Sequence, residues 1–271
     1  MPELPEIANL ARQMTKELKG KRIIDLDVTQ PRCLNMPVKK LRRIVSKSVE
    51  ETTAKGKWLF TNLHPNDNLL LNLGMGGDVR YHRSNATLPK KHQFQLTFDD
   101  ETKLTVAFSW FGYIHLASGK ELLKHKMTNK LGISPIEKEF TVEKLVSLLS
   151  GRRGAIKSFL LNQKNVAGIG NVYVQDVLFR ARLHPLRMIQ TLSESEIQTL
   201  HRSIRETLNQ SIRRGGLKYE RDLYGRHGRY GPEHFLVAYK THEPCPTCKT
   251  AVVKIRTGST ASYVCPKCQK L

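Results

Sequence analysis

The chain begins with a pattern of apolar positions that is typical of one face of a helix. Apolar side chains recur at intervals of three and four residues, at Ile7, Leu10, Ala11, Met14 and Leu18. Glu3, Pro5 and Glu6 stand in what would be the first turn, where proline and acids are favoured, and Gly20 follows as a C-cap. The pattern predicts a helix from about residue 3 to 19 that anchors the first residues of the chain.

A different pattern follows from about residue 22 to 117, where apolar and polar residues alternate over short segments. A period of two is typical of strands with one buried face. Turn residues separate the segments, which are 22–28, 58–63, 69–73, 93–98 and 103–108. This region is predicted to form an antiparallel sandwich or barrel.

Residues 131–135 have the composition of a linker, and beyond them the spacing of apolar residues becomes helical again. Thr141 is expected to cap the first of the helices, which the pattern places at 141–149, 154–161, 172–182 and 193–214. Residues 215–236 are rich in Gly, Arg and Tyr and are expected to form a mobile basic loop. The chain is therefore predicted to have an α+β multidomain fold, with domains at 1–130, 136–236 and 237–271.

The balance of charges adds a class of partner to this picture. The 271 residues carry a formal net charge of +21, and an excess of Lys and Arg favours a polyanion because binding to phosphates releases condensed counterions. Charge alone does not separate DNA from RNA, and an anionic membrane surface competes, although no amphipathic helix supports it. No run of about 18 apolar residues would span a membrane. The acidic opening MPELPE lacks the apolar core of a secretory signal, so a bacterial cytosol is expected.

Four of the five cysteines lie near the end of the sequence as two C-x2-C pairs, Cys245 with Cys248 and Cys265 with Cys268. Each pair places two thiolates on one side of a tight turn, and two such turns complete a tetrahedron around Zn²⁺. Since protein ligands fill all four positions, one structural zinc is expected. A redox pair or ordinary buried cysteines are the weaker interpretations, and Cys33 is expected to be a packed residue.

A glycine-rich segment, residues 165–171, joins two of the predicted helices. Gly168 and Gly170 permit close backbone approach, and the helix that follows presents N–H groups to an anion. Several basic residues lie just upstream, namely Arg152, Arg153, Lys157 and Lys164. This context favours a DNA phosphate as the ligand over a plain helix–helix turn.

Together these residues resemble the formamidopyrimidine-DNA glycosylase / endonuclease VIII family. The resemblance covers nearly the whole chain and is carried by residues 1–6, the Lys57 segment, residues 73–75, residues 156–173 and the four-cysteine finger. It implies an N-terminal antiparallel β-sandwich flanked by helices, a helix-two-turns-helix domain with a lesion-capping loop, and a C-terminal zinc ribbon. It also implies a base-excision-repair glycosylase with AP lyase activity. Such an enzyme acts as a nucleoid-associated monomer on double-stranded DNA that contains a damaged base or an abasic site.

The resemblance implies that Pro2 is the nucleophile once Met1 has been removed, that Glu3 is a general acid, and that Lys57 engages phosphate and assists elimination. An α-amino group has a pKa of about 7.7–8.0, so much of it is neutral near pH 7. A secondary amine that attacks the sugar C1′ gives a charged iminium, which is an electron sink for β-elimination. Glu6, one turn further along the helix, is expected to face the same pocket. Without the resemblance, Pro2 and Glu3 would mark only a helix start, and Lys57 a solvated charge.

The same resemblance assigns the DNA contacts. The residues implied to hold phosphates around the lesion are His92, Arg152, Lys157 and Asn171. Met75 and Phe111 are implied to wedge into the base stack, which offsets the cost of unstacking. Simple core packing is the alternative for these two apolar residues.

Four positions depart from the family pattern. Ser109 and Trp110 stand where the family has paired arginines, Thr260 where the finger has an arginine, and Asp176 where a glutamate is usual. Those arginines contact the base opposite the lesion and a neighbouring phosphate, so a changed substrate preference is expected. In the absence of an arginine at position 260, β-elimination is expected to outweigh δ-elimination.

Three kinds of protein account for these observations to different degrees. An active glycosylase explains why Pro2, Glu3 and Lys57 occur together, since a binding protein has no chemical need for them. A catalytically weak or inactive DNA-binding member of the same scaffold explains the departures. A zinc-ribbon ribosomal or transcription protein explains the charge and the cysteines but not the opening six residues.

Overall fold

The computed structural model describes residues 1–271, which form two compact units. Unit 1 comprises residues 1–130 and 214–229, and unit 2 comprises residues 131–213 and 230–271. The sequence pattern placed residues 214–229 with the helical domain. They belong to unit 1 because Leu217 and Leu223 donate backbone hydrogen bonds to Glu6 and Gln13 of the first helix.

Helix α1 (Leu4–Leu18) begins where the sequence pattern places it. Glu3 is its N-cap and forms a capping box with Glu6, so two backbone N–H groups of the first turn gain partners. Gly20 follows the helix with φ +84°, a left-handed conformation that suits glycine at a helix end. Apolar side chains of α1 pack against the strands in the main core cluster of this unit.

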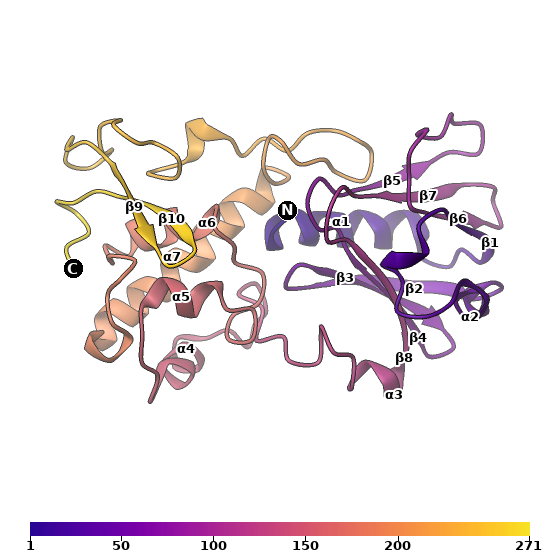
Figure 1. The fold of residues 1–271 in the computed structure, drawn as a ribbon, viewed down its shortest axis with the longest axis horizontal. Helices are drawn as coiled ribbons and strands as arrows, with labels where there is room; N and C mark the ends of the chain where they lie inside the picture. The colour runs from indigo at the N-terminus through magenta and orange to yellow at the C-terminus, as the bar shows by residue number, and fades with distance from the viewer. The chain divides into compact units, whose positions relative to one another are not determined.

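Two four-stranded antiparallel sheets make up the rest of unit 1 (Figure 1). One has the strand order β2 (Ser48–Lys55), β3 (Trp58–His64), β4 (Asp67–Asn72), β8 (Tyr113–Ser118). The other has the order β1 (Ile23–Val28), β6 (Phe94–Phe98), β7 (Lys103–Ala107), β5 (Asp78–His82). Short helices complete the unit: η1 (Pro31–Cys33), α2 (Val38–Leu41), η2 (Arg42–Ile44) and α3 (Gly119–Leu122). The predicted antiparallel sandwich is confirmed, and β2, β5 and β8 are strands that the apolar alternation did not mark.

Unit 2 contains four helices and a hairpin, and Figure 1 shows β9 and β10 beside α6. Its elements are α4 (Val142–Leu149), α5 (Ile156–Leu161), α6 (Tyr173–Arg180), η3 (Ile189–Thr191), α7 (Glu194–Arg213), η4 (Pro232–His234), β9 (Val253–Thr257) and β10 (Thr260–Val264). Helix α6 packs against both α7 and β10, and α4 packs against α7. Thr141 caps α4 as predicted, through a hydrogen bond from Lys144 N–H of 3.2 Å. None of the helices is long and apolar enough to cross a membrane.

Two connecting segments differ from the expectations. The predicted linker is packed into unit 2, because Ile133 pairs with Val166 and Ser134 is fully buried. The predicted mobile basic loop is fixed by apolar anchors, since Leu217, Leu223 and Tyr230 are buried. In both segments packing against distant residues decides the structure, and the local composition does not predict that packing.

Candidate catalytic residues and DNA contacts

The start of α1 is buried in unit 1 and tied down on both sides. Pro2 and Glu3 are buried, and the Glu3 N–H donates to Glu6 Oε2 at 2.8 Å. The other oxygen of Glu6, Oε1, accepts from the Leu217 N–H at 3.0 Å. The backbone that carries Pro2 and Glu3 is therefore held in one conformation by the carboxylate of Glu6.

Glu6 was expected to face the same pocket as Pro2 and Glu3. Its side chain is buried, and its two oxygens accept the backbone N–H groups of Glu3 and Leu217. Even a Cβ at Gly216 would lie 2.9 Å from this carboxylate, so the segment that follows α7 presses closely on it. Glu6 therefore connects the start of α1 to the segment that follows α7.

Glu220 is an acid near the chain start that sequence reasoning missed. The ammonium group of Met1 lies 3.6 Å from Glu220 Oε1. Burial raises the pKa of Glu220, the ammonium group opposes this rise, and the nearby Glu3 and Asp78 add to it. The only sequence signal was an acid within an otherwise basic stretch. The carboxyl group of Glu220 consequently lies beside the N-terminus, where it suits proton transfer.

Lys57 lies in the tight turn between β2 and β3 and is partly exposed. Its carbonyl oxygen accepts a hydrogen bond of 3.1 Å from Asn72 Nδ2, which fixes the turn to β4. The next residue, Trp58, is buried and stacks on Tyr113 with ring centroids 6.1 Å apart. The backbone of Lys57 is therefore fixed, while its side chain reaches the surface.

The other predicted contacts of unit 1 lie on loops. His92 is partly exposed, and its Nδ1 lies 3.1 Å from the Pro89 carbonyl oxygen. Met75 and Phe111 are both exposed, which excludes the core-packing alternative for them. Trp110, beside Phe111, is exposed as well.

Lys157 of α5, for which a phosphate contact was expected, is buried, with only 2% of its surface exposed. Its Nζ lies 2.7–3.1 Å from four oxygen atoms of the β9–β10 hairpin, those of Thr257, Thr260, Ala261 and Ser262. Burial lowers the pKa of the Lys157 ammonium to about 8. The lysine joins the helices of unit 2 to the hairpin, and Thr260 is one of its partners there.

The glycine-rich turn leads into α6 as expected, with Asn171 partly exposed just before it. Gly168 and Gly170 are buried, and the Gly168 N–H donates to Gln163 Oε1 at 2.8 Å, so this donor is not open to an anion. Gln175 Nε2 donates to Asn171 Oδ1 at 3.1 Å and to the Ala261 carbonyl at 3.2 Å. Gln175, which sequence reasoning passed over, therefore positions Asn171 against the hairpin. Arg152, upstream, is exposed.

Asp176 has a clear structural task. Its two oxygens accept the backbone N–H groups of Leu236, Val237 and Ala238 at 2.9–3.1 Å. These residues lead into the cysteine finger. Asp176 thus holds the entry to the finger against α6, and nothing points to a contact with a ligand.

The four cysteines of the finger meet the requirements of a zinc site. Their sulfur atoms all lie within 4.8 Å of one another, with Cys245 and Cys268 3.9 Å apart. A tetrahedral site with Zn–S distances of 2.3 Å needs sulfur atoms about 3.8 Å apart. The Cys268 N–H points to Cys265 Sγ at 3.4 Å, a donor that favours a thiolate. These residues fit one structural Zn²⁺, as the sequence predicted.

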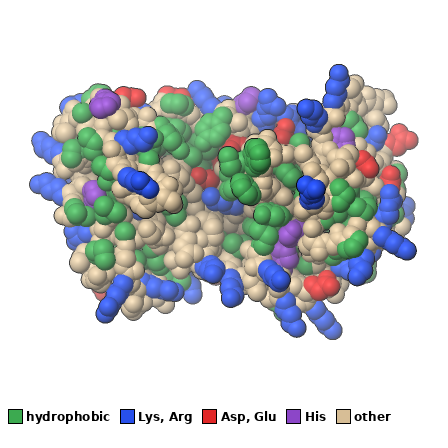
Figure 2. Space-filling view, viewed as in Figure 1, with side chains coloured by type: hydrophobic (Ala, Val, Ile, Leu, Met, Phe, Trp, Pro, Cys, Tyr) green, Lys and Arg blue, Asp and Glu red, His purple; other side chains and the backbone are tan.

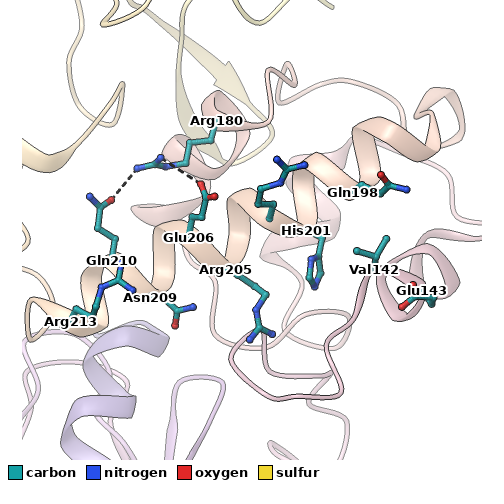
Figure 3. A pocket seen from close by; sticks show the side chains of 11 residues that line it. Val142, Glu143, Arg180, Gln198, His201, Arg205, Glu206, Asn209, Gln210 and Arg213 are labelled. Atoms are coloured by element: carbon teal, nitrogen blue, oxygen red, sulfur yellow. Dashed lines mark hydrogen bonds and ion pairs between the residues drawn. The ribbon is translucent and has the colours of Figure 1, made fainter.

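A hollow of about 780 Å³ lies elsewhere in unit 2, along α7 (Figure 3). Arginines, amides and two acids line it, and Arg180 is tied to Gln210 at 3.0 Å and to Glu206 at 3.9 Å. None of the predicted catalytic or DNA-contact residues lines it. It adds to the basic character of the surface, where Figure 2 shows Lys and Arg side chains spread over the visible face.

Three family models match the chain in order. They are the formamidopyrimidine-DNA glycosylase N-terminal domain over residues 1–108, the formamidopyrimidine-DNA glycosylase H2TH domain over residues 131–221, and a zinc finger found in FPG and IleRS over residues 243–271. The chain belongs to the formamidopyrimidine-DNA glycosylase family. Membership in this family confirms the resemblance drawn from the opening residues and the finger.

Similar proteins share the whole length of the chain. The formamidopyrimidine-DNA glycosylase of Chloroflexus aggregans is 34% identical, over 100% of this chain and 99% of the relative. That of Lactococcus lactis is 31% identical, over 100% of both chains. The solved structure of wild-type Lactococcus lactis Fpg (MutM) with a DNA containing N7-benzyl-Fapy-dG has a TM-score of 0.89, with 31% identity and 100% of each chain covered. A complex of Lactococcus lactis Fpg with a DNA containing an abasic site has a TM-score of 0.88, with 30% identity, and covers 99% of this chain and 100% of that chain.

Proposed function

We propose that the chain is a base-excision-repair DNA glycosylase with AP lyase activity, and that it acts on double-stranded DNA through the amine of Pro2. The observation that carries this proposal is the start of α1. Pro2 and Glu3 lie on buried backbone that Glu6 and Leu217 hold in place, and the carboxyl group of Glu220 lies beside the chain start. Nucleophilic catalysis requires such a fixed amine next to a proton donor.

The Pro2 amine takes part in both the removal of the base and the cleavage of the strand. With Met1 removed, the Pro2 nitrogen attacks C1′ of the sugar, and the bond from C1′ to the damaged base breaks. The nitrogen then loses its proton, the C1′–O4′ bond of the sugar ring breaks, and O4′ takes up a proton, which leaves an iminium at C1′. The iminium withdraws electrons, so a proton leaves C2′ and the C3′–O bond breaks in β-elimination, with the 3′ phosphate as the leaving group. Glu3 supplies and accepts protons as the sugar ring opens. The structural zinc supplies no step; it stabilises the finger.

The DNA contacts are proposed for the residues that reach the surface. Lys57, His92, Arg152 and Asn171 are partly or fully exposed and suit contacts with phosphates. Met75 and Phe111 suit a wedge into the base stack. Lys157 is proposed to hold the hairpin rather than touch phosphate, since its ammonium already faces four oxygen atoms. With Thr260 in place of an arginine, β-elimination is proposed to outweigh δ-elimination.

We also propose that the chain acts as a monomer at the bacterial nucleoid. The relatives named above are bacterial. A DNA substrate would place the protein with the chromosome.

A second candidate is a DNA-structure binder that keeps the scaffold without the reaction. The residues that favour it are Ser109, Trp110 and Thr260, where the family has arginines. Retention of Pro2, Glu3 and Lys57 favours the enzyme.

Trapping with borohydride separates the two candidates. The protein is incubated with a duplex that contains an abasic site and with borohydride, and the Pro2→Gly variant is compared. The enzyme should give a covalent protein–DNA species, at a much lower yield in the variant. If the native chain gives no trapped species although it binds the duplex, the binder is the correct function.

A further inference from the structure

Two loops of unit 1 are joined into one element, which we name the loop tip (residues 74–77 and 109–112). The Met75 N–H donates to the Trp110 carbonyl at 2.8 Å, and the Ser109 N–H donates to the Met75 carbonyl at 3.0 Å. A Cβ at Gly74, which has φ +52°, would overlap the Trp110 carbonyl oxygen. The backbones of the two loops are therefore in direct contact, and their side chains have fixed starting points.

Three large apolar side chains of the loop tip are nevertheless left in solvent. Met75 is 48% exposed, Trp110 67% and Phe111 68%. Phe111 also has φ +57°, a left-handed conformation that disfavours a bulky residue. Exposed apolar side chains on a rigid backbone, at a conformational cost, indicate a surface that a ligand covers.

The loop tip has almost no means of reading the edge of a base. It contains no Arg, Lys, Asn or Gln. The Ser109 hydroxyl is pressed towards Gly76, where a Cβ would lie 2.9 Å from Ser109 Oγ. The indole N–H of Trp110 is a single donor, and every base offers at least one acceptor. Discrimination between bases normally needs two matched hydrogen bonds from one side chain.

We propose that this enzyme does not select the base opposite the lesion, because Trp110 meets that base by stacking. The inference rests on the proposed function. When a base leaves the duplex, its former partner loses its pairing and part of its stacking. An aromatic side chain stacks on any base, since every base has a π-face. The substrate class is therefore a lesion or abasic site opposite any of the four bases.

Four duplexes that differ only at one position test this proposal. Each contains a single abasic site, opposite A, C, G or T, so that lesion identity plays no part. Single-turnover lyase rates are expected to agree within about threefold, the range that stacking differences allow. A preference of about tenfold or more for one base would overturn the inference, because it would require a base-edge contact. Absence of product from all four duplexes would instead contradict the proposed function, and the inference would fall with it.

Variants identify the side chain responsible. Trp110→Ala should lower the rate by a similar factor on all four duplexes, on the order of tenfold, and Trp110→Phe should keep most of it. Leu123→Ala is the matched control, because Leu123 is 79% exposed and lies outside the loop tip. Ser109→Arg adds a two-donor side chain and should create a clear preference for one base. If Trp110→Ala slows only one of the four duplexes, Trp110 reads that base and the proposal is wrong. Thermal unfolding of each variant establishes that it is folded.

Discussion

Lys57 of the β2–β3 turn and Lys157 of α5 were each expected to hold a phosphate, and the structure places the two lysines in different surroundings. Lys57 is partly exposed on a turn that Asn72 fixes. Lys157 is buried, and its ammonium faces four oxygen atoms of the hairpin. The ammonium group of Lys57 can therefore reach a substrate, whereas that of Lys157 holds the hairpin inside unit 2. Burial and available acceptors decide the part that a basic residue plays.

Loss of zinc is expected to have the largest effect of the changes considered, and it acts on the β9–β10 hairpin that Lys157 contacts. A structural Zn²⁺ contributes about 10–16 kcal/mol in small fingers, so chelation should unfold the finger together with the partners of Lys157. DNA affinity should fall by at least about tenfold as phosphate contacts are lost. Metal content and binding to an abasic-site duplex are measured on the same sample. Unchanged affinity after demonstrated metal loss would show that the finger contributes nothing to binding.

Substitution of Lys57 should separate chemistry from stability. Lys57→Ala is expected to lower the single-turnover lyase rate by about 10²–10⁴-fold, the range for a lost proton-transfer or phosphate-positioning group. The free energy of unfolding should change by less than about 0.5 kcal/mol, because the side chain is partly exposed. Lys55→Ala, on the same turn, is the control. Equal rates for the two variants would remove Lys57 from the reaction.

Substitution of Lys157 should lower the stability of the protein and change the lyase rate only a little. Lys157→Met leaves the hairpin oxygens without their donor, and unit 2 should lose about 1–3 kcal/mol of stability. The lyase rate at saturating DNA should change far less than for Lys57→Ala. Lys164→Met is the matched control, since Lys164 is exposed. If Lys157→Met has normal stability, and the salt dependence of its DNA affinity corresponds to one phosphate contact fewer, then Lys157 contacts DNA.

The smallest expected effect is a pH dependence of unit 1 beside the Lys57 turn. Burial lowers the pKa of His115 from 6.5 to about 4, and the neighbouring His125, 2.8 Å away, adds to this. The unfolded chain therefore takes up a proton between pH 6.5 and 4 that the folded chain does not, and stability falls as the pH drops through this window. The loss should be about 1–2 kcal/mol after allowance for solvent screening.

His115→Asn isolates that contribution. Asparagine keeps a hydrogen-bonding group near the ring Nδ1 and does not titrate. Urea unfolding at pH 7.5 and at pH 5 gives the change for each protein, and carboxylates contribute equally to both. The native chain should lose more stability than the variant. The same loss in both would mean that His115 is protonated in the folded state.

Much of the fold follows from the sequence, and the exceptions have a physical cause. Helix α1 could be predicted because its apolar face is periodic, Pro5 and Glu6 stand in its first turn and Gly20 follows its end. Strand β2 was missed because its segment, SVEETTAK, buries mainly Val49 and Thr52 and shows no apolar alternation. The contacts of residues 214–229 with unit 1 could not be predicted, because Glu6 and Gln13, about 210 positions away, accept their hydrogen bonds.

Some residues of the candidate site could also be predicted from the sequence, and others could not. The cysteine spacing alone predicts the zinc ligands, since a tight turn fixes the distance within each pair. The catalytic assignments came from the resemblance, because a proline before a helix has no local mark of reactivity. The burial of Lys157 could not be predicted, since its partners lie about 100 positions further along the chain. Glu220 and Gln175 were missed for the same reason.

Mapping the covalent attachment to DNA tests whether Pro2 is the nucleophile. Abasic-site DNA is trapped on the native protein with borohydride, the DNA is digested, and mass spectrometry locates the modified residue and the state of the N-terminus. We expect a chain without Met1 that carries the sugar remnant on Pro2. Attachment to Lys57 or another lysine, with Pro2 unmodified, would contradict it.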